Sequence, residues 1–135
     1  MGKRATRSGE VLNDAYQLDE LVSDEGHVEL YRAIDKRTDA VVLVKLLRPE
    51  FALQSELVDS VLRRPRLLCN VAHESLPMVR VDSDETGIPF VVEETVQGRA
   101  LSDLAETFPQ GMPVSLVCQL GLPLVEALAL AHRHG

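Results

Sequence analysis

Aromatic and basic residues are scarce in this sequence. Only 4% of its 135 residues are aromatic, none is tryptophan, and 14 basic residues face 21 acidic ones, for a net charge of −7. Surfaces that bind nucleic acid are usually basic, and those that bind single strands add exposed aromatic rings. We therefore predict that the protein has no nucleic-acid partner.

Cysteines and long apolar runs are also few. Cys69 and Cys118 lie in apolar, helix-like segments without metal-ligand spacing, so we expect buried, reduced side chains in a cytoplasmic protein. His73, His132 and His134 have no ligating partners in the sequence, which predicts no metal site. No unbroken run of about 18 apolar residues occurs, and no apolar core follows the charged N-terminus, so we predict no membrane span and no signal peptide.

What the chain does contain is a series of short β-type segments. Residues 1–13 are polar and aperiodic, and we expect a flexible tail. Five strands are then predicted from alternating or β-branched patterns, at residues 16–22, 28–35, 40–47, 78–83 and 88–95. The first three are joined by short turns, and Gly87 suits the turn between the last two.

Three helical segments interrupt or follow these strands. Residues 55–70 have apolar residues at helical spacing, with Ser55 as a plausible N-cap and Pro65 expected to kink or break the helix. A short helix is predicted at 101–107 and a long one at 114–134. Strands and helices are segregated along the chain, which predicts an α+β fold, with one domain at 14–97 and a helical segment at 98–135.

Five stretches, in this order, resemble the N-terminal lobe (N-lobe) of bacterial serine/threonine protein kinases. They are "VELYRAID" (28–35), "VLVK" (42–45), "HESLPMVRV" (73–81), "IPFVVEETVQG" (88–98) and "LVEALALAHRHG" (124–135). The resemblance implies a five-stranded antiparallel sheet with one packed helix. Two further helices would begin a second lobe.

The resemblance also implies where a nucleotide would bind. Kinases hold ATP phosphates under a glycine-rich loop and by a strand lysine that pairs with a helix glutamate. The three glycine positions fall on Ser23, Glu25 and Val28, and the lysine on Lys45. The glutamate position falls on Arg64, and no carboxylate lies within two residues of it.

The remaining pocket positions by resemblance are Leu30, Leu43, Glu93, Glu94 and Val96. Leu43 replaces the small residue that leaves room for adenine, and Glu93 stands at the gatekeeper position before the hinge. A carboxylate that faces a core needs a partner, so we hypothesise that Glu93 pairs with Lys45. The alternative is that Glu93 faces solvent through a one-residue difference in register.

The 135 residues contain no H-R-D or D-F-G segment, and no nucleophile with an adjacent base. We therefore predict no catalytic residue and no cofactor, and the sequence leans against an enzyme. The preferred interpretation is a non-catalytic, pseudokinase-type module for signalling. One alternative is a fragment of a kinase that still binds ATP and Mg²⁺, and another is a small dimeric binding domain unrelated to kinases.

The long C-terminal helix predicts an interaction surface. Leu120, Leu124 and Leu128 fall on one face of it. A large exposed apolar stripe is unusual in a soluble monomer, so we expect a protein partner or a second copy of the chain to cover this face.

Overall fold

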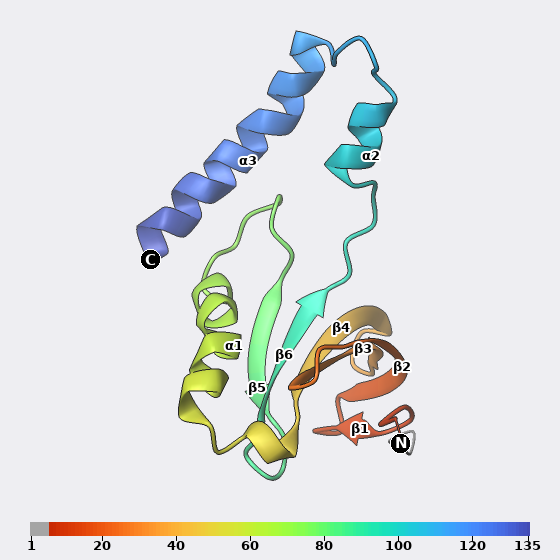
Figure 1. The fold of residues 1–135 in the computed structure, drawn as a ribbon, viewed down its shortest axis with the longest axis vertical. Coiled ribbons are helices and arrows are strands. Elements are labelled where there is room, and N and C mark those ends of the chain that lie inside the picture. Colours follow the sequence, from red (N-terminus) through yellow and green to blue (C-terminus); the bar gives the residue numbers. More distant parts are fainter. Residues whose placement is uncertain (1–5) are drawn as a thin grey trace.

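The computed structural model describes residues 6–135, and its centre is one curled antiparallel sheet (Figure 1). The six strands are arranged in the order β1-β2-β3-β4-β6-β5. Their bounds are Val11–Leu12 (β1), Tyr16–Asp24 (β2), Val28–Asp35 (β3), Ala40–Leu47 (β4), Val79–Ser83 (β5) and Pro89–Glu94 (β6). The five longer strands are those predicted from the sequence, with ends that differ by at most two residues.

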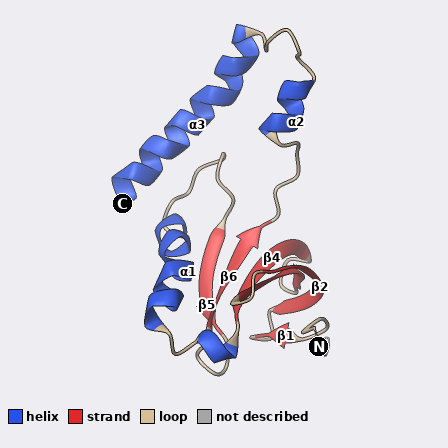
Figure 2. Cartoon of the chain, in the orientation of Figure 1, coloured by secondary structure: helices blue, strands red, loops and turns tan. Residues whose placement is uncertain are grey.

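The helices lie beside and beyond this sheet (Figure 2). A short 3-10 helix, η1 (Pro49–Phe51), leads from β4 into α1 (Ser55–Leu68), and α2 (Leu101–Glu106) and α3 (Val114–His134) follow the last strand. Helix α1 packs along β5, whereas α2 and α3 lie beyond the end of β6, with α3 directed back toward the end of α1 (Figure 1). The α+β class predicted from the sequence is confirmed.

The two faces of the sheet bury different apolar clusters. On one face the curl of the strands encloses the main core, in which Tyr31, Val44 and Phe90 are almost fully buried. On the other face, Leu62 of α1 packs with Val79 and Val91. The alternation of side chains along each strand divides the residues between the two clusters.

The N-terminal segment differs from its prediction. Residues 6–13 were expected in a flexible tail, but Val11 and Leu12 form β1, which pairs with β2 and makes the sheet six-stranded. The backbone N–H of Arg7 donates to the Tyr31 hydroxyl at 3.0 Å, and Nδ2 of Asn13 donates to the carbonyl of Ser83 at 2.8 Å. The segment therefore covers the open side of the curl. The rest of the predicted tail, residues 1–5, lies outside the described residues.

Helix α1 differs from its prediction at both ends. Ser55 is the first helical residue, and the N-cap position belongs to Gln54, which makes no side-chain capping bond. The helix does not break at Pro65 but continues to Leu68. Pro65 is buried in the last turn, where its missing N–H removes only one backbone hydrogen bond.

Helix α3 has little contact with the rest of the described chain. Of its residues only Ala127 is buried. By length and composition alone the helix is apolar enough to cross a membrane. The sequence predicted no span, because it has no unbroken run of about 18 apolar residues. Core helices of soluble proteins pass the same test, so this property is weak support for a membrane span.

The two cysteines are exposed, contrary to prediction. Cys69 caps the C-terminus of α1, and Cys118 lies in the first half of α3. An apolar sequence context predicted burial, but α3 has few neighbours that could cover Cys118, and Cys69 projects from a helix end.

Candidate functional site

The strand register gathers most of the predicted pocket residues on one face of the sheet. Leu30 of β3 lies opposite Lys45 of β4, and Leu43 lies opposite Glu93 of β6. Residues opposite each other in an antiparallel pair share a face, as do residues two apart on one strand. Leu30, Leu43, Lys45 and Glu93 therefore point to the same side, together with Val28, which is opposite Leu47.

Lys45 and Glu93 form an ion pair on this face. Nζ of Lys45 donates to Oε1 of Glu93 at 3.1 Å, and the two side chains are 40% and 26% exposed. The strand lysine therefore has a carboxylate partner that comes from β6 rather than from a helix. Glu93 does not turn to solvent, and its register is the one that the hypothesis of pairing required.

Glu94 and Val96 do not join this group. Glu94 points to the other side of β6, where its Oε2 accepts a hydrogen bond from the backbone N–H of Met78 at 3.1 Å. Val96 follows the strand and is 73% exposed. These two hinge positions thus lie apart from the Lys45–Glu93 pair.

The β2–β3 hairpin uses its own backbone donors at the tip. The N–H of Glu25 donates to the carbonyl of Val28 at 2.9 Å, and the N–H of Gly26 donates to Oδ1 of Asp24 at 2.9 Å. Gly26 has φ +85°, a conformation that glycine adopts without strain. Phosphate cradles depend on free, converging N–H groups, and these two donors already have partners. Ser23 is a strand residue opposite Leu30.

Helix α1 offers no carboxylate to Lys45. Its inward residues are Leu62 and Pro65, whereas Arg64 is exposed. The acidic residues of the helix, Glu56 and Asp59, are exposed near its start. In the structure, as in the assignment by resemblance to kinases, no acidic group of α1 lies at the glutamate position.

Sequence reasoning missed a second charged cluster beside the hairpin. Arg48 follows β4, and its Nη2 lies 2.6 Å from Oδ2 of Asp24 and 3.1 Å from Oε1 of Glu29. The only available signal was the alternation of Glu29 with its apolar neighbours. A contact between the end of one strand and the tip of another hairpin requires the register, which the sequence does not display.

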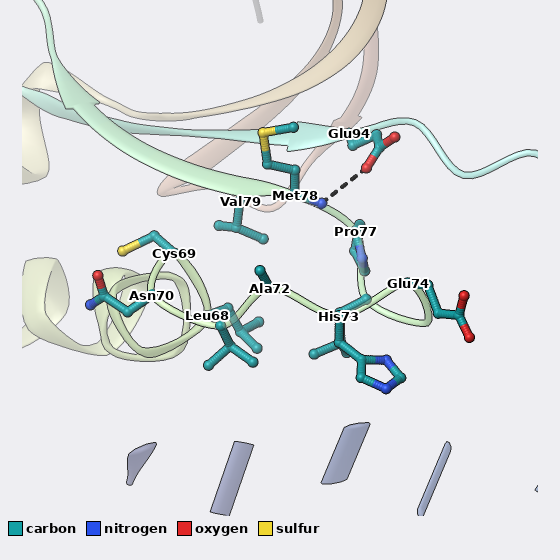
Figure 3. Close-up of a pocket in the computed structure, with 12 residues that line it drawn as sticks. Leu68, Cys69, Asn70, Ala72, His73, Glu74, Pro77, Met78, Val79 and Glu94 are labelled. Atoms are coloured by element: carbon teal, nitrogen blue, oxygen red, sulfur yellow. Dashed lines mark hydrogen bonds between the residues drawn. The ribbon is translucent and has the colours of Figure 1, made fainter. Parts of the chain in front are cut away.

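The cavity drawn in Figure 3 lies elsewhere and measures about 480 Å³. It lies between the α1–β5 loop and the ends of β5 and β6, and Figure 3 shows Met78 and Glu94 joined across its edge. Glu94 is the only predicted pocket residue in its lining. Among the described residues, no three His, Cys, Asp or Glu side chains gather as a metal site would require.

The predicted interaction face on α3 is partly exposed. Leu124 and Leu128 are 48% and 56% exposed, whereas Leu120 is half-buried. Further exposed apolar residues extend the surface around the helix, namely Val114, Val117, Leu122 and Val125. We call this set, with Leu124 and Leu128, the α3 apolar face.

A curled antiparallel sheet with one helix packed on its edge strand, a strand lysine facing that side and two helices beyond the last strand define the N-lobe fold of a protein kinase. The kinase domain of Mycobacterium tuberculosis PknI matches with a TM-score of 0.66 and 22% sequence identity, over 97% of this chain and 52% of that domain. No family model matches the chain.

Sequence comparison points the same way. The probable serine/threonine-protein kinase PknB of Corynebacterium glutamicum is 30% identical over 129 residues, which are 93% of this chain and 20% of that protein. Serine/threonine-protein kinase PknL of M. tuberculosis is 26% identical over 135 residues, 99% of this chain and 33% of that protein. The chain therefore spans between a fifth and a third of these relatives and is homologous to the N-lobe region of their kinase domains. The interpretation as a binding domain unrelated to kinases is wrong.

Proposed function

We propose that this chain is the N-lobe of a non-catalytic, pseudokinase-type module that acts through protein contacts in signalling. The observation that carries the proposal is the ion pair between Lys45 and Glu93. In a kinase the lysine holds nucleotide phosphates while a helix glutamate orients it. Here the lysine pairs with Glu93, which stands at the gatekeeper position. An anionic ligand that approached Lys45 would therefore also meet a carboxylate.

Two further features support the proposal. The tip of the β2–β3 hairpin has its Glu25 and Gly26 amides in internal bonds, and the Glu25 carboxylate adds negative charge near any phosphate. Leu43 shares the face of Lys45, and by resemblance to kinases it replaces the small residue that leaves room for adenine. The three features disfavour nucleotide binding in different ways: the Glu93 carboxylate by its charge, the hairpin tip by its lack of free N–H donors, and Leu43 by its volume.

The test is a thermal-shift titration with Mg-ATP. A site with a dissociation constant of about 10 µM would gain about 2.7 kcal/mol at about 1 mM ligand, which raises the melting temperature of a chain this long by roughly 9 °C. We expect no shift in the chain without substitutions (the parent), with or without Mg²⁺. The matched control is Lys45→Ala, which should behave like the parent.

A second function has one observation in its favour. The similarity to the relatives named as serine/threonine kinases extends over more than nine-tenths of this chain, which supports a kinase fragment that retains weak ATP binding. A melting shift in the parent that disappears in Lys45→Ala would establish that function and overturn the first. A shift that persists in Lys45→Ala would indicate binding away from this face, and would leave the face itself without nucleotide.

The partner is proposed to bind at the α3 apolar face. Exposed apolar patches often mark contact surfaces in soluble proteins. A protein partner or a second copy of the chain would remove these side chains from water, and the net charge of −7 supports neither a nucleic acid nor an anionic lipid surface. We place the module in the cytoplasm, without a cofactor of its own.

A further inference from the structure

One arginine ties the tip of the β2–β3 hairpin to the segment after β4, in addition to the pairing of β3 with β4. Nη2 of Arg48 reaches both Asp24 at the end of β2, at 2.6 Å, and Glu29 in β3, at 3.1 Å. The guanidinium thus bridges the two strands of the hairpin on either side of the turn at residues 25–27. A single cation thus holds two carboxylates beside the turn of the hairpin.

The Glu29 side of this bridge is better protected than the other ion pairs near the hairpin. The side chains of Arg48 and Glu29 are 12% and 16% exposed, and that of Asp24 is 44% exposed, whereas those of Arg32 and Asp19, farther along the same strands, are each about half exposed. Charged hydrogen bonds that are shielded from water are stronger and less screened by salt. Exposed pairs such as Arg32–Asp19 contribute little to rigidity.

Arg48 also connects the hairpin to the start of α1. Its backbone N–H donates to the carbonyl of His27 at 3.0 Å, which extends the pairing of β3 with β4 to the turn. The ring of His27 meets that of Phe51 edge-on, with centroids 6.4 Å apart. Phe51 ends η1, and the N–H of Gln54 at the N-cap of α1 donates to the carbonyl of Phe51 at 3.0 Å.

We propose that Arg48 is a latch that makes the hairpin tip and the η1–α1 junction one rigid unit. The latch goes beyond the proposed function, because it concerns how this edge of the lobe moves rather than what it binds. Loss of the guanidinium frees Asp24 and Glu29. The turn is then held at this edge by the backbone bond from Arg48 to His27 and by the contact of His27 with Phe51, so greater motion of the turn reaches the start of α1 through Phe51. A partner whose own cation captures Asp24 or Glu29 would have the same effect, which makes the junction responsive to contacts at the hairpin.

Hydrogen–deuterium exchange tests the latch in the Arg48→Ala variant. We expect about tenfold faster exchange in peptides that cover residues 24–28 and 49–54, because the bonds that protect these amides open locally. The central strands should exchange at the parental rate. The matched control is Arg32→Ala, which removes the exposed pair with Asp19 on the same hairpin and should leave both segments unchanged.

Two outcomes would overturn the proposal. The first is parental exchange at residues 24–28 in Arg48→Ala. The second is faster exchange at the tip without any change at 49–54, which would show that the hairpin tip and the start of α1 move independently. If Arg48→Ala does not fold, Asp24→Asn provides the same test, since the amide oxygen keeps the bond from Gly26 while the charge is lost. A Mg-ATP titration of the same samples reports on the proposed function separately, because exchange at the tip does not depend on a nucleotide.

Discussion

At the scale of single residues, Lys45 and Glu93 form an ion pair between β4 and β6. Both side chains retain contact with water, at 40% and 26% exposure, so the attraction between them is moderate. Neither group is buried deeply enough to require the other for folding. Under the proposed function, the pair would affect ligand binding more than the stability of the sheet.

A double-mutant cycle measures this pair. We expect Lys45→Met and Glu93→Gln each to lower the free energy of unfolding by about 0.5–1 kcal/mol, with a coupling energy of the same size, because the pair is partly solvated. Urea denaturation at neutral pH gives the three differences. The exposed pair of Arg32 and Asp19 serves as a control and should couple more weakly. A coupling energy near zero for Lys45 and Glu93 would mean that the two groups do not interact in solution.

The sequence could predict this pair but not the latch. Lys45 and Glu93 became candidates because the motifs around them fixed their strands and faces, and side-chain alternation then placed both on one side. Arg48 lies beyond the end of a strand, and its guanidinium crosses to carboxylates 24 and 19 residues earlier. Contacts of that kind depend on the sheet register and on the reach of a long flexible side chain, and no repeating pattern in the sequence reveals either of them.

At the scale of elements, the turn between β3 and β4 depends on one buried carboxylate. Asp35 is 4% exposed, its Oδ1 and Oδ2 accept bonds from the Arg37 guanidinium at 2.9 Å each, and its Oδ1 also accepts from the Arg37 backbone N–H at 3.0 Å. Nη2 of Arg37 also donates to the Tyr16 hydroxyl at 2.6 Å. Hydrogen bonding from the Arg37 side chain is the main cause that lowers the pKa of Asp35 below its usual value, against the opposing effect of desolvation.

This turn should make stability depend on pH in the acid range. A lowered pKa in the folded state stabilises the protein above the unfolded value of about 3.9, and that contribution is lost as the pH falls through the lower folded value. We expect Asp35→Asn to be less stable than the parent at pH 7, with a difference that shrinks below about pH 4. Urea titrations across this range provide the measurement.

Arg37→Met removes the same interaction from the other side and should give a similar profile. Equal pH dependence in the parent and in Asp35→Asn would show that this carboxylate is not the group responsible.

The elements themselves were largely predictable, and the exceptions have physical causes. Strong alternation and β-branched runs located the five longer strands. The two-residue strand β1 has too few residues for any period, and it is recognised only by its pairing with β2. Pro65 was expected to break α1, but a proline near a helix end removes only one bond, and burial of its ring offsets that loss.

At the scale of the whole molecule, the sheet holds almost all of the buried residues, and α3 holds one. The two halves of the chain thus differ in what supports them: the sheet has its own core, and the α3 apolar face is uncovered. The length and apolar composition of α3 made it recognisable as a helix from the sequence. The sequence could not indicate its lack of neighbours, because an apolar period predicts burial without naming what covers it.

Association through α3 is measurable by sedimentation across a concentration series. We expect the parent chain to self-associate, and Leu124→Glu with Leu128→Glu to abolish this, because charges on the α3 apolar face oppose its burial. Gln119→Glu, an exposed change on the same helix, is the matched control and should associate like the parent. A parent chain that stays monomeric at high concentration would count against a second copy and would leave a different protein partner. Partition of the parent into neutral lipid vesicles would instead identify a membrane as the cover.

The bare surface of α3 also has a thermal consequence. Whatever covers it removes apolar groups from water, so the association will carry a negative change in heat capacity. The affinity of such a contact falls on cooling, because the driving force from apolar hydration weakens at low temperature. We therefore expect the chain to dissociate from its partner most readily at low temperature, while the sheet, which has its own core, stays folded.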